Sequence, residues 1–280
     1  MAEYGDYNGL LNRVTQGDCL EVMKLIPDKS IDMILCDLPY GKTALKWDCI
    51  IPLNPLWEQY KRIIKDNGAI VLTSQQPFTS QLIMSEPRLF RYELIWDKDV
   101  AGAFVLAKKR PLPRHENILV FYKKAPTYNP QMTDADPRKI RPISKKSTVS
   151  KALPVASGKV RSADDYNPSK RYPTSIIKYS ARAGECNPLN RLHETQKPLA
   201  LFEWLIKTYT NEGEVVLDNC IGSGTTAVAA INTNRQFIGI EREAKYVEIA
   251  NKRIAEALER KTGGTSLFPW CAKDEGRKST

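Results

Sequence analysis

Two apolar runs that each end in a polar turn most constrain how this chain can fold. The runs are Ile31–Cys36 and Val215–Leu217, and the turns that follow them are Asp37-Leu38-Pro39-Tyr40 and the glycine-containing segment Asp218–Thr226. Short apolar runs bounded by turn residues are typical of buried strands. Ligands bind at the carboxyl ends of the strands in open α/β sheets. The pattern therefore predicts two loops at one sheet edge, the first catalytic and the second cofactor-binding.

Strand and helix patterns alternate along most of the chain. Strands are expected at 13–16, 31–36, 69–73, 92–96, 117–122, 215–218 and 236–240. Helices are expected at 19–25, 56–65, 77–85, 199–210, from about 225, and at 244–260, with Asn54-Pro55 starting the second and Asn67-Gly68 ending it. This alternation predicts an α/β fold with a mostly parallel, doubly wound, Rossmann-like sheet.

The regular pattern is lost between residues 125 and 190, where prolines, serines, lysines and isolated tyrosines follow no sustained period. We expect this segment to be an insert rather than part of the core. The core then has two halves, a catalytic half at 1–124 and a cofactor-binding half at 191–261, followed by a flexible tail at 262–280. A chain of 280 residues is long enough for one α/β core and a smaller appended region.

The positive charge of the chain is concentrated in its middle. The formal net charge is +10, and the segment from Lys108 to Arg182 holds 18 basic and 5 acidic residues. This segment therefore carries +13, and the remaining residues carry −3. A near-neutral scaffold with a basic insert is the electrostatic footprint of a nucleic-acid binder. The alternative is a solvated loop that is basic for solubility.

The bulk properties predict a soluble cytoplasmic protein without a membrane partner. No stretch approaches the roughly 18 consecutive apolar residues of a membrane-spanning helix, and the first residues have neither a basic start nor an apolar segment. The six cysteines show no paired C-x-x-C spacing, and only two histidines accompany them. We therefore expect free thiols and no metal site.

The glycine turn after the second apolar run has the composition of a nucleoside-cofactor loop. Gly222 and Gly224 allow the backbone to approach a ligand at the start of a helix. Asp218 can accept a hydrogen bond from an amine or a hydroxyl group. Glu241 ends the next predicted strand, where an acid usually binds a ribose diol in such folds. A tight turn alone would explain a Gly-x-Gly, but the order of turn, helix, strand and acid is more specific.

The Asp37 loop has the groups needed to activate an exocyclic amino group of a nucleobase. Such a nitrogen is a poor nucleophile because its lone pair is delocalised into the ring. The Asp37 carboxylate and the backbone carbonyl of Leu38 or Pro39 could accept its two N–H bonds and stabilise the developing positive charge. Tyr40 could stack on a base that has left the duplex. The alternative is a simple strand-ending turn.

Together these motifs resemble those of amino-group DNA methyltransferases, in the group whose catalytic motif precedes the target-recognition region and whose cofactor motif comes last. The resemblance covers nearly everything outside residues 125–190. The matching segments are Gly17-Asp18, similar to the segment that contacts the cofactor's adenine; Asp37-Leu38-Pro39-Tyr40, similar to D-P-P-Y; His193–Pro198, similar to H-x-x-Q-K-P; Asp218–Thr226, similar to D-P-F-x-G-S-G-T-T; and Gly239-Ile240-Glu241, similar to the ribose-binding strand end.

The resemblance implies S-adenosylmethionine as cofactor, double-stranded DNA as partner and residues 125–190 as the target-recognition region. It also implies a bacterial or phage-infected host cytoplasm. The implied catalytic residues are Asp37, Leu38, Pro39 and Tyr40. The implied cofactor-binding residues are Asp18, Cys19, Thr195, Lys197, Asp218, Cys220, Gly222, Gly224, Thr225 and Glu241.

Two positions depart from the family pattern. Leu38 replaces the first proline of the catalytic motif, which keeps the carbonyl acceptor but removes a ring that stiffens the loop. Asn219-Cys220 replaces the usual Pro-Phe of the cofactor loop, so an aromatic side chain is missing there. Neither change removes a group that the proposed chemistry needs.

The resemblance favours methylation of adenine at N6. The alternative within the family is cytosine-N4 methylation, whose enzymes typically carry serine where Asp37 stands. A catalytically idle basic nucleic-acid-binding module is the alternative from another class. In the tail, Leu267, Phe268 and Trp270 are expected to pack on the protein's own surface or to help form a homodimer. Docking of this segment onto a sliding clamp is the less favoured interpretation.

Overall fold

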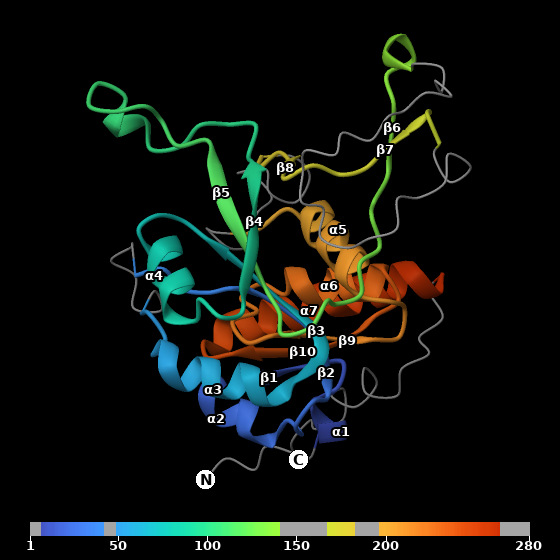
Figure 1. Cartoon of the computed structure of the whole chain (residues 1–280). Helices are drawn as coiled ribbons and strands as arrows, with labels where there is room; N and C mark the ends of the chain where they lie inside the picture. The colour runs from blue at the N-terminus through green and yellow to red at the C-terminus, as the bar shows by residue number, and fades with distance from the viewer. Residues whose placement is uncertain (1–6, 42–48, 141–166, 183–195, 264–280) are drawn as a thin grey trace, which may run out of the picture. The chain divides into compact units, whose positions relative to one another are not determined.

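The computed structural model describes residues 7–41, 49–140, 167–182 and 196–263 of the chain. The chain divides into two compact units, one formed by residues 1–129 and 175–280 and the other by residues 130–174. The larger unit carries the main sheet (Figure 1).

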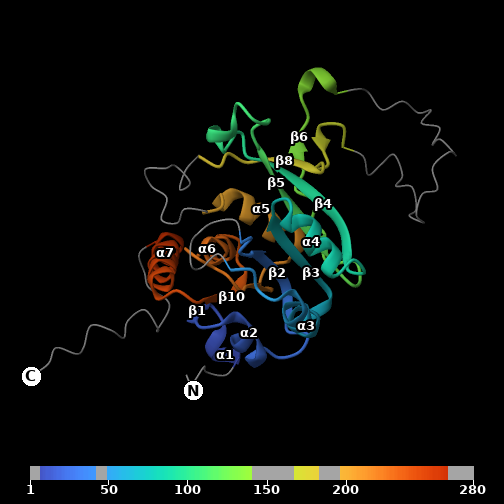
Figure 2. The ribbon, with the colours of Figure 1, turned by 90° about the vertical axis from the view of Figure 1, so that its left-hand side faces the viewer.

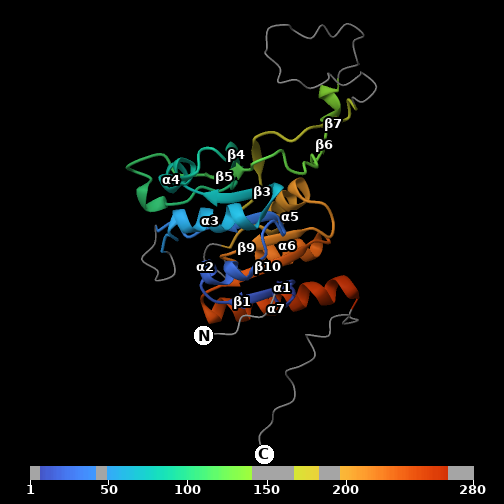
Figure 3. The same cartoon turned by 60° about the horizontal axis from the view of Figure 1, so that its bottom comes forward.

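This main sheet has eight strands in the order β1-β10-β9-β2-β3-β5-β4-β8. Figure 3 shows β1 toward one end of the unit and β4 and β5 toward the other. Within the described residues, β5 is the one strand of the main sheet that runs against its neighbours. The predicted mostly parallel α/β fold is therefore confirmed. The strands are β1 (Arg13–Gln16), β2 (Ile31–Asp37), β3 (Ile64–Ser74), β4 (Phe90–Asp97), β5 (His115–Phe121), β8 (Ile176–Lys178), β9 (Val215–Asp218) and β10 (Gln236–Glu241).

Helices cover both faces of the sheet (Figure 2). They bury two separate apolar clusters, one on each face. Side chains alternate along a strand, so Met33 and Leu35 of β2 join one cluster while Ile34 and Cys36 join the other. Helices α5, α6 and α7 pack on the first face, and α1 to α4 pack on the second. The helices are α1 (Tyr7–Leu10), α2 (Cys19–Val22), α3 (Leu53–Ile63), α4 (Phe78–Ser85), α5 (Leu199–Tyr209), α6 (Thr225–Asn232) and α7 (Ala244–Thr262).

The predicted boundary between α3 and β3 was wrong. Helix α3 begins at Leu53, after Pro52, and Pro55 lies within its first turn, where a missing N–H is tolerated. The strand follows at once, and Gly68 lies inside it rather than at a helix end. The pairing with β2 shifts between Ile31 and Met33, and a Cβ at Gly68 would lie 2.8 Å from the Asp32 carbonyl oxygen. Gly68 therefore marks an irregularity in the sheet.

Two further elements differ from the expectation. The helix predicted at 19–25 is α-helical only to Val22 and continues as the 3-10 turn η1 (Met23–Leu25). Strand β8, inside the range expected to be an insert, pairs with β4 in the main sheet. Its three residues are too few to show a strand period in the sequence.

The smaller unit contains a two-stranded antiparallel sheet of β6 (Thr133–Asp134) and β7 (Lys170–Arg171), and the 3-10 turn η3 (Pro137–Lys139). The tail segment predicted to pack, dimerise or dock on a clamp lies outside the described residues. In the part of the chain that the structure describes, no helix is both long and apolar enough to cross a membrane.

Candidate active site

The predicted catalytic and cofactor loops border one cavity of about 450 Å³ in the larger unit. Asp37 ends β2, Asp218 ends β9 and Glu241 ends β10, while the reversed strand β5 brings Glu116 to the same edge. Gly224 does not line this cavity, and Thr195 lies outside the described residues. The other predicted site residues all line it: Asp18, Cys19, Asp37, Leu38, Pro39, Tyr40, Lys197, Asp218, Cys220, Gly222, Thr225 and Glu241.

Three side chains hold the Asp37 carboxylate. Its Oδ1 accepts hydrogen bonds from the Tyr40 hydroxyl at 2.6 Å and from the Thr73 hydroxyl. Its Oδ2 accepts a hydrogen bond from Lys197 Nζ at 2.5 Å. The sequence interpretation missed Thr73, although Thr73 stands opposite Asp37 in the pairing of β2 with β3. The carboxylate is therefore fixed in orientation at the cavity wall.

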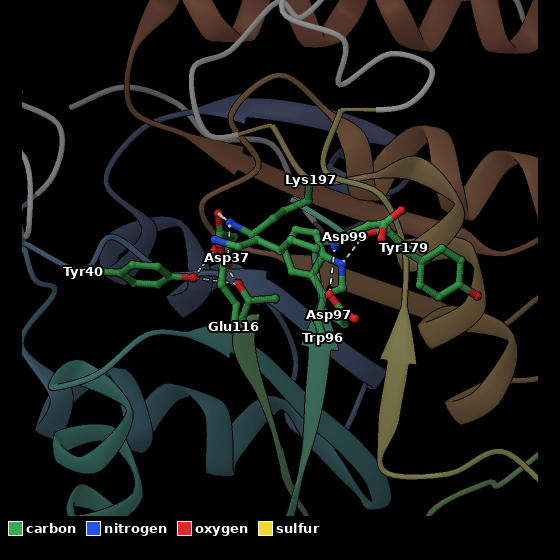
Figure 4. A network of polar contacts seen from close by, with 10 residues as sticks. Asp37, Tyr40, Trp96, Asp97, Asp99, Glu116, Tyr179 and Lys197 are labelled. Carbon is green, nitrogen blue, oxygen red and sulfur yellow. Dashed lines mark hydrogen bonds and ion pairs between the residues drawn. The ribbon is translucent and has the colours of Figure 1, made fainter. Parts of the chain in front are cut away.

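Lys197, which the resemblance implied to be a cofactor-binding residue, contacts Asp37 of the catalytic loop. Its ammonium group is buried, and burial alone would lower its pKa. The charges of Asp37 and Glu116, and the hydrogen bond with Asp37, outweigh burial and raise the pKa above its ordinary value. Lys197 is therefore a permanent cation beside Asp37 (Figure 4).

Sequence reasoning also missed a second acid and a second amine at this site. Glu116 is buried, and its Oε2 lies 3.7 Å from Lys197 Nζ. Its Oε1 lies 3.2 Å from Lys98 Nζ. Glu116 stands opposite Trp96 in the pairing of β4 with β5, which fixes its place at the cavity edge. The sequence gives no direct sign that β5 is reversed, so this acid could not be assigned to the site.

Tyr40 has a polar and an apolar contact. Its hydroxyl donates to Asp37, and burial together with the nearby Asp37 charge raises its pKa well above the ordinary value. The phenol therefore stays protonated as a hydrogen-bond donor. The ring lies 5.6 Å from the Phe78 ring and 5.7 Å from Lys197 Nζ. A tilted aromatic neighbour and a cation thus restrain the ring next to Asp37.

The cofactor loop is built around two acids. Asp218 Oδ1 accepts a hydrogen bond from the Cys220 amide at 3.0 Å, and Oδ2 accepts one from the Thr226 hydroxyl. Burial raises the pKa of Asp218 to about 6. Glu241 accepts hydrogen bonds from the Gly222 and Glu243 amides, both at 2.9 Å. Burial raises the pKa of Glu241 as well.

Gly224 has a packing role rather than a lining role. It precedes α6 with φ +86°, in the left-handed region. A Cβ there would lie 3.0 Å from the Ala250 Cβ of α7. The glycine lets the loop approach α7 closely, which aligns the first turn of α6 with the cavity.

The thiols near the cofactor loop are free and protonated. Cys19, Cys36 and Cys220 form no disulfide, and burial raises the pKa of Cys36 to about 12. Asp18 accepts a hydrogen bond from the Leu20 amide at 2.8 Å and so caps α2 beside Cys19. Within the described ranges no three histidine, cysteine or acidic side chains are grouped as metal ligands.

The fold and the paired loops define a class of nucleic-acid-modifying enzyme, and comparison with known families identifies it. A model of the DNA methylase family that groups N6- and N4-methylating enzymes matches residues 31–252. The chain belongs to this family. The resemblance inferred from the motifs is therefore confirmed.

Two curated relatives match nearly the whole chain. The type II methyltransferase M.HpaI of Haemophilus parainfluenzae is 28% identical, over 86% of this chain and 74% of its own length. The DNA adenine methyltransferase YhdJ of Escherichia coli K12 is 28% identical, over 90% of each chain.

Solved structures share the fold. The complex of M1.HpyAVI with SAM matches with a TM-score of 0.58 and 24% identity, over 86% of this chain and 98% of the other. The PvuII DNA methyltransferase, described as cytosine-N4-specific, matches with a TM-score of 0.59 and 16% identity, over 90% and 93% of the two chains. The same fold therefore occurs in an enzyme named for cytosine.

Proposed function

We propose that this protein is a site-specific DNA adenine-N6 methyltransferase. The observation that carries the proposal is the placement of Asp37, which is held by three donors at the wall of a cavity that the glycine loop also lines. S-adenosylmethionine is the methyl donor. The substrate of the protein is a flipped-out adenine of double-stranded DNA in a bacterial or phage-infected cytoplasm.

The cavity fits this cofactor in size and in polar groups. Its volume of about 450 Å³ lies within the range of cavities that hold ligands of this size. Glu241 lines the cavity at a strand end and has lone pairs left for a ribose diol. Asp218 lines it as a second acid, suited to a cationic amine or sulfonium. S-adenosylmethionine supplies an electrophilic methyl group when bound.

The chemistry of the Asp37 loop is activation of an amine. One N–H of the target amino group donates to Asp37 and the other to the carbonyl of Leu38, which turns the nitrogen lone pair out of the base plane. With S-adenosylmethionine bound, its methyl group would pass to this nitrogen and its sulfonium would leave as a neutral thioether. The negative charge of Asp37 stabilises the positive charge that develops on nitrogen. The nitrogen then loses a proton to solvent.

Asp37 and the relative YhdJ favour adenine over cytosine. The aspartate occupies the position where cytosine-N4 enzymes of this family typically carry serine. YhdJ, named a DNA adenine methyltransferase, covers 90% of the chain. The fold itself is neutral on this point, because the cytosine-N4-specific PvuII enzyme shares it.

The proposal is tested by identifying the product. The protein is incubated with S-adenosylmethionine and unmethylated genomic DNA, and the digested nucleosides are analysed by mass spectrometry. N6-methyladenine is expected, and N4-methylcytosine as the sole product would contradict the adenine assignment. Absence of cofactor binding in calorimetry would instead favour an idle DNA-binding module.

Asp37→Ala is expected to lower the methylation rate at least 100- to 1,000-fold, roughly the cost of losing one preorganised group in an active site. Cofactor affinity should stay close to that of the wild type, because Asp37 acts on the amino group. Single-turnover rates and calorimetry measure the two effects separately. A near-normal rate would disprove the mechanism.

A further inference from the structure

Two buried charges, Lys197 and Glu116, lie beside two partly buried ones, Asp37 and Lys98, at the proposed catalytic loop. Lys197 Nζ lies 2.5 Å from Asp37 Oδ2 and 3.7 Å from Glu116 Oε2, and Lys98 Nζ lies 3.2 Å from Glu116 Oε1. The side chains of Lys197 and Glu116 are each 8% exposed. Burying charges is costly unless they are paired, and these two acids and two amines balance one another. Lys197 is the member that faces both acids (Figure 4).

One oxygen of this cluster lacks a hydrogen-bond partner. Glu116 Oε2 is fully buried and accepts no hydrogen bond from any residue that the structure describes. Leaving a buried acceptor unsatisfied costs about 1–3 kcal/mol, and more for a charged group. Such a group in a native protein requires an explanation. The ammonium of Lys197 lies 3.7 Å from it and is hydrogen-bonded to Asp37.

The arrangement also presents a difficulty for the proposed chemistry. Asp37 Oδ1 already accepts from Tyr40 and Thr73, so the target amino group must use Oδ2. Lys197 occupies Oδ2. A fixed cation on the same oxygen would repel the positive charge that develops on the amino nitrogen. Oδ2 keeps a second lone pair for the target amino group, but the carboxylate stabilises the developing charge fully only once Lys197 has moved away from it.

We propose that Glu116 is a positioning residue that receives Lys197 when the target amino group binds to Asp37. The ammonium exchanges one carboxylate for the other, so no covalent bond changes and the cluster stays neutral. The movement is small, because 3.7 Å exceeds an ordinary hydrogen-bond distance by less than about 1 Å. This inference rests on the proposed methyl transfer, and it holds for either an adenine or a cytosine amino group.

The oxygen without a hydrogen bond then belongs to the first of two positions that Lys197 takes. In the arrangement that the structure shows, Lys197 neutralises Asp37 and keeps the carboxylate oriented at the cavity wall. With the base bound, Glu116 Oε2 gains the hydrogen bond that it lacks, which offsets the loss of the bond between Lys197 and Asp37. Lys98 remains on Glu116 Oε1 and holds that side chain in place.

Glu116→Gln tests the inference, with Glu93→Gln as the matched control. Glu93 lies on the neighbouring strand β4 and accepts a hydrogen bond from Asn117, but it is exposed and does not contact Lys197. Single-turnover methylation of unmethylated genomic DNA should slow roughly 10- to 100-fold in Glu116→Gln, the worth of one hydrogen bond to a charged group. Cofactor affinity should change less than about twofold, and Glu93→Gln should match the wild type. An unchanged rate in Glu116→Gln would overturn the inference.

A double-mutant cycle separates positioning from a purely structural effect. If Glu116 acts through Lys197, Glu116→Gln should have almost no further effect in a Lys197→Met background. Additive losses in the double variant would overturn the inference, because Glu116 would then act by another route.

A measurement on the unaltered protein keeps the test independent of variant folding. The wild type is crystallised with sinefungin and with unmethylated DNA that contains the sequence it methylates. In this complex, Lys197 Nζ should lie within hydrogen-bond distance of Glu116 Oε2. An ammonium still on Asp37 Oδ2, with the target amino group bound, would overturn the inference. If the wild type methylates no base, the proposed function fails and this inference fails with it. If the wild type methylates DNA and Glu116→Gln does so equally fast, only this inference fails.

Discussion

At the scale of single residues, Tyr40 combines two interactions that substitution can separate. Its hydroxyl donates to Asp37, and its ring lies beside Phe78 at the cavity wall. Tyr40→Phe removes only the first, and a loss of about 1 kcal/mol, or roughly fivefold in the methylation rate, is expected. Tyr40→Ala should also weaken binding of the flipped base by about 1–3 kcal/mol. Single-turnover rates and fluorescence of 2-aminopurine at the target position measure the two losses, and equal losses in both variants would contradict this division.

Asp218 makes cofactor affinity depend on pH. Its pKa is raised to about 6 by burial, so a proton occupies the carboxyl group as the pH falls below that value. A ligand with a sulfonium and an ammonium group favours the ionised acid, and its affinity should therefore fall as the pH decreases from 7 to 5. Folding stability without the cofactor has the opposite pH dependence. The raised pKa of Asp218 stabilises the folded protein at pH values below the pKa of this group in the unfolded chain, and this stabilisation is lost as the pH rises through 6. Calorimetry across this range is the measurement. Asp218→Asn should remove the part of the pH dependence of cofactor affinity that comes from Asp218. The part that comes from Glu241, whose pKa is also raised, should remain.

At the scale of elements, the start of α6 depends on the contact of the glycine loop with α7. Gly224→Ala introduces both left-handed strain and a Cβ that would lie 3.0 Å from the Ala250 Cβ. Gly213→Ala is the matched control, since its φ is +81° but no atom lies within 4 Å of the added Cβ. The control should lose about 1 kcal/mol of unfolding free energy, and Gly224→Ala about 1–3 kcal/mol more. Denaturant titration measures both, and equal losses would show that the α6–α7 contact is not tight.

The elements also show how far the sequence could predict the molecule. Local patterns predicted the bounds of β1, β9 and α5 to within about one residue. The spacing of apolar residues and a proline at the start of a helix are signals that depend only on neighbouring residues. The three-residue β8 and the boundary between α3 and β3 depend on pairing partners distant in sequence. Motifs predicted the Asp37 and Asp218 loops. Thr73, Lys98 and Glu116 belong to none of these motifs. Only the strand register places Thr73 opposite Asp37 and brings Lys98 and Glu116 to the cavity.

At the scale of the whole molecule, recognition of DNA is expected to be separable from chemistry. The smaller unit at 130–174 can be exchanged without removing β8 from the main sheet. Replacing it with the corresponding segment of a relative that has a different target should move the methylated sequence while cofactor affinity stays unchanged. Sequencing that reports modified bases reads out the result, and an unchanged target in a folded hybrid would place recognition elsewhere. The basic charge of this region should also make DNA affinity fall steeply with salt.

The reversed direction of β5 gives the connection at 98–114 a freedom that connections with a core helix lack. Because β4 and β5 are adjacent and antiparallel, this connection is a hairpin loop, and the register of Trp96 with Glu116 fixes its base. The ion pair of Arg114 with Asp97 at 2.7 Å closes the same base. Insertions or deletions at the tip therefore leave Glu116 in place. During divergence the loop can therefore change in length and sequence while Lys197, Asp37 and Glu116 keep their geometry. A connection that contains a core helix has no such mutational tolerance.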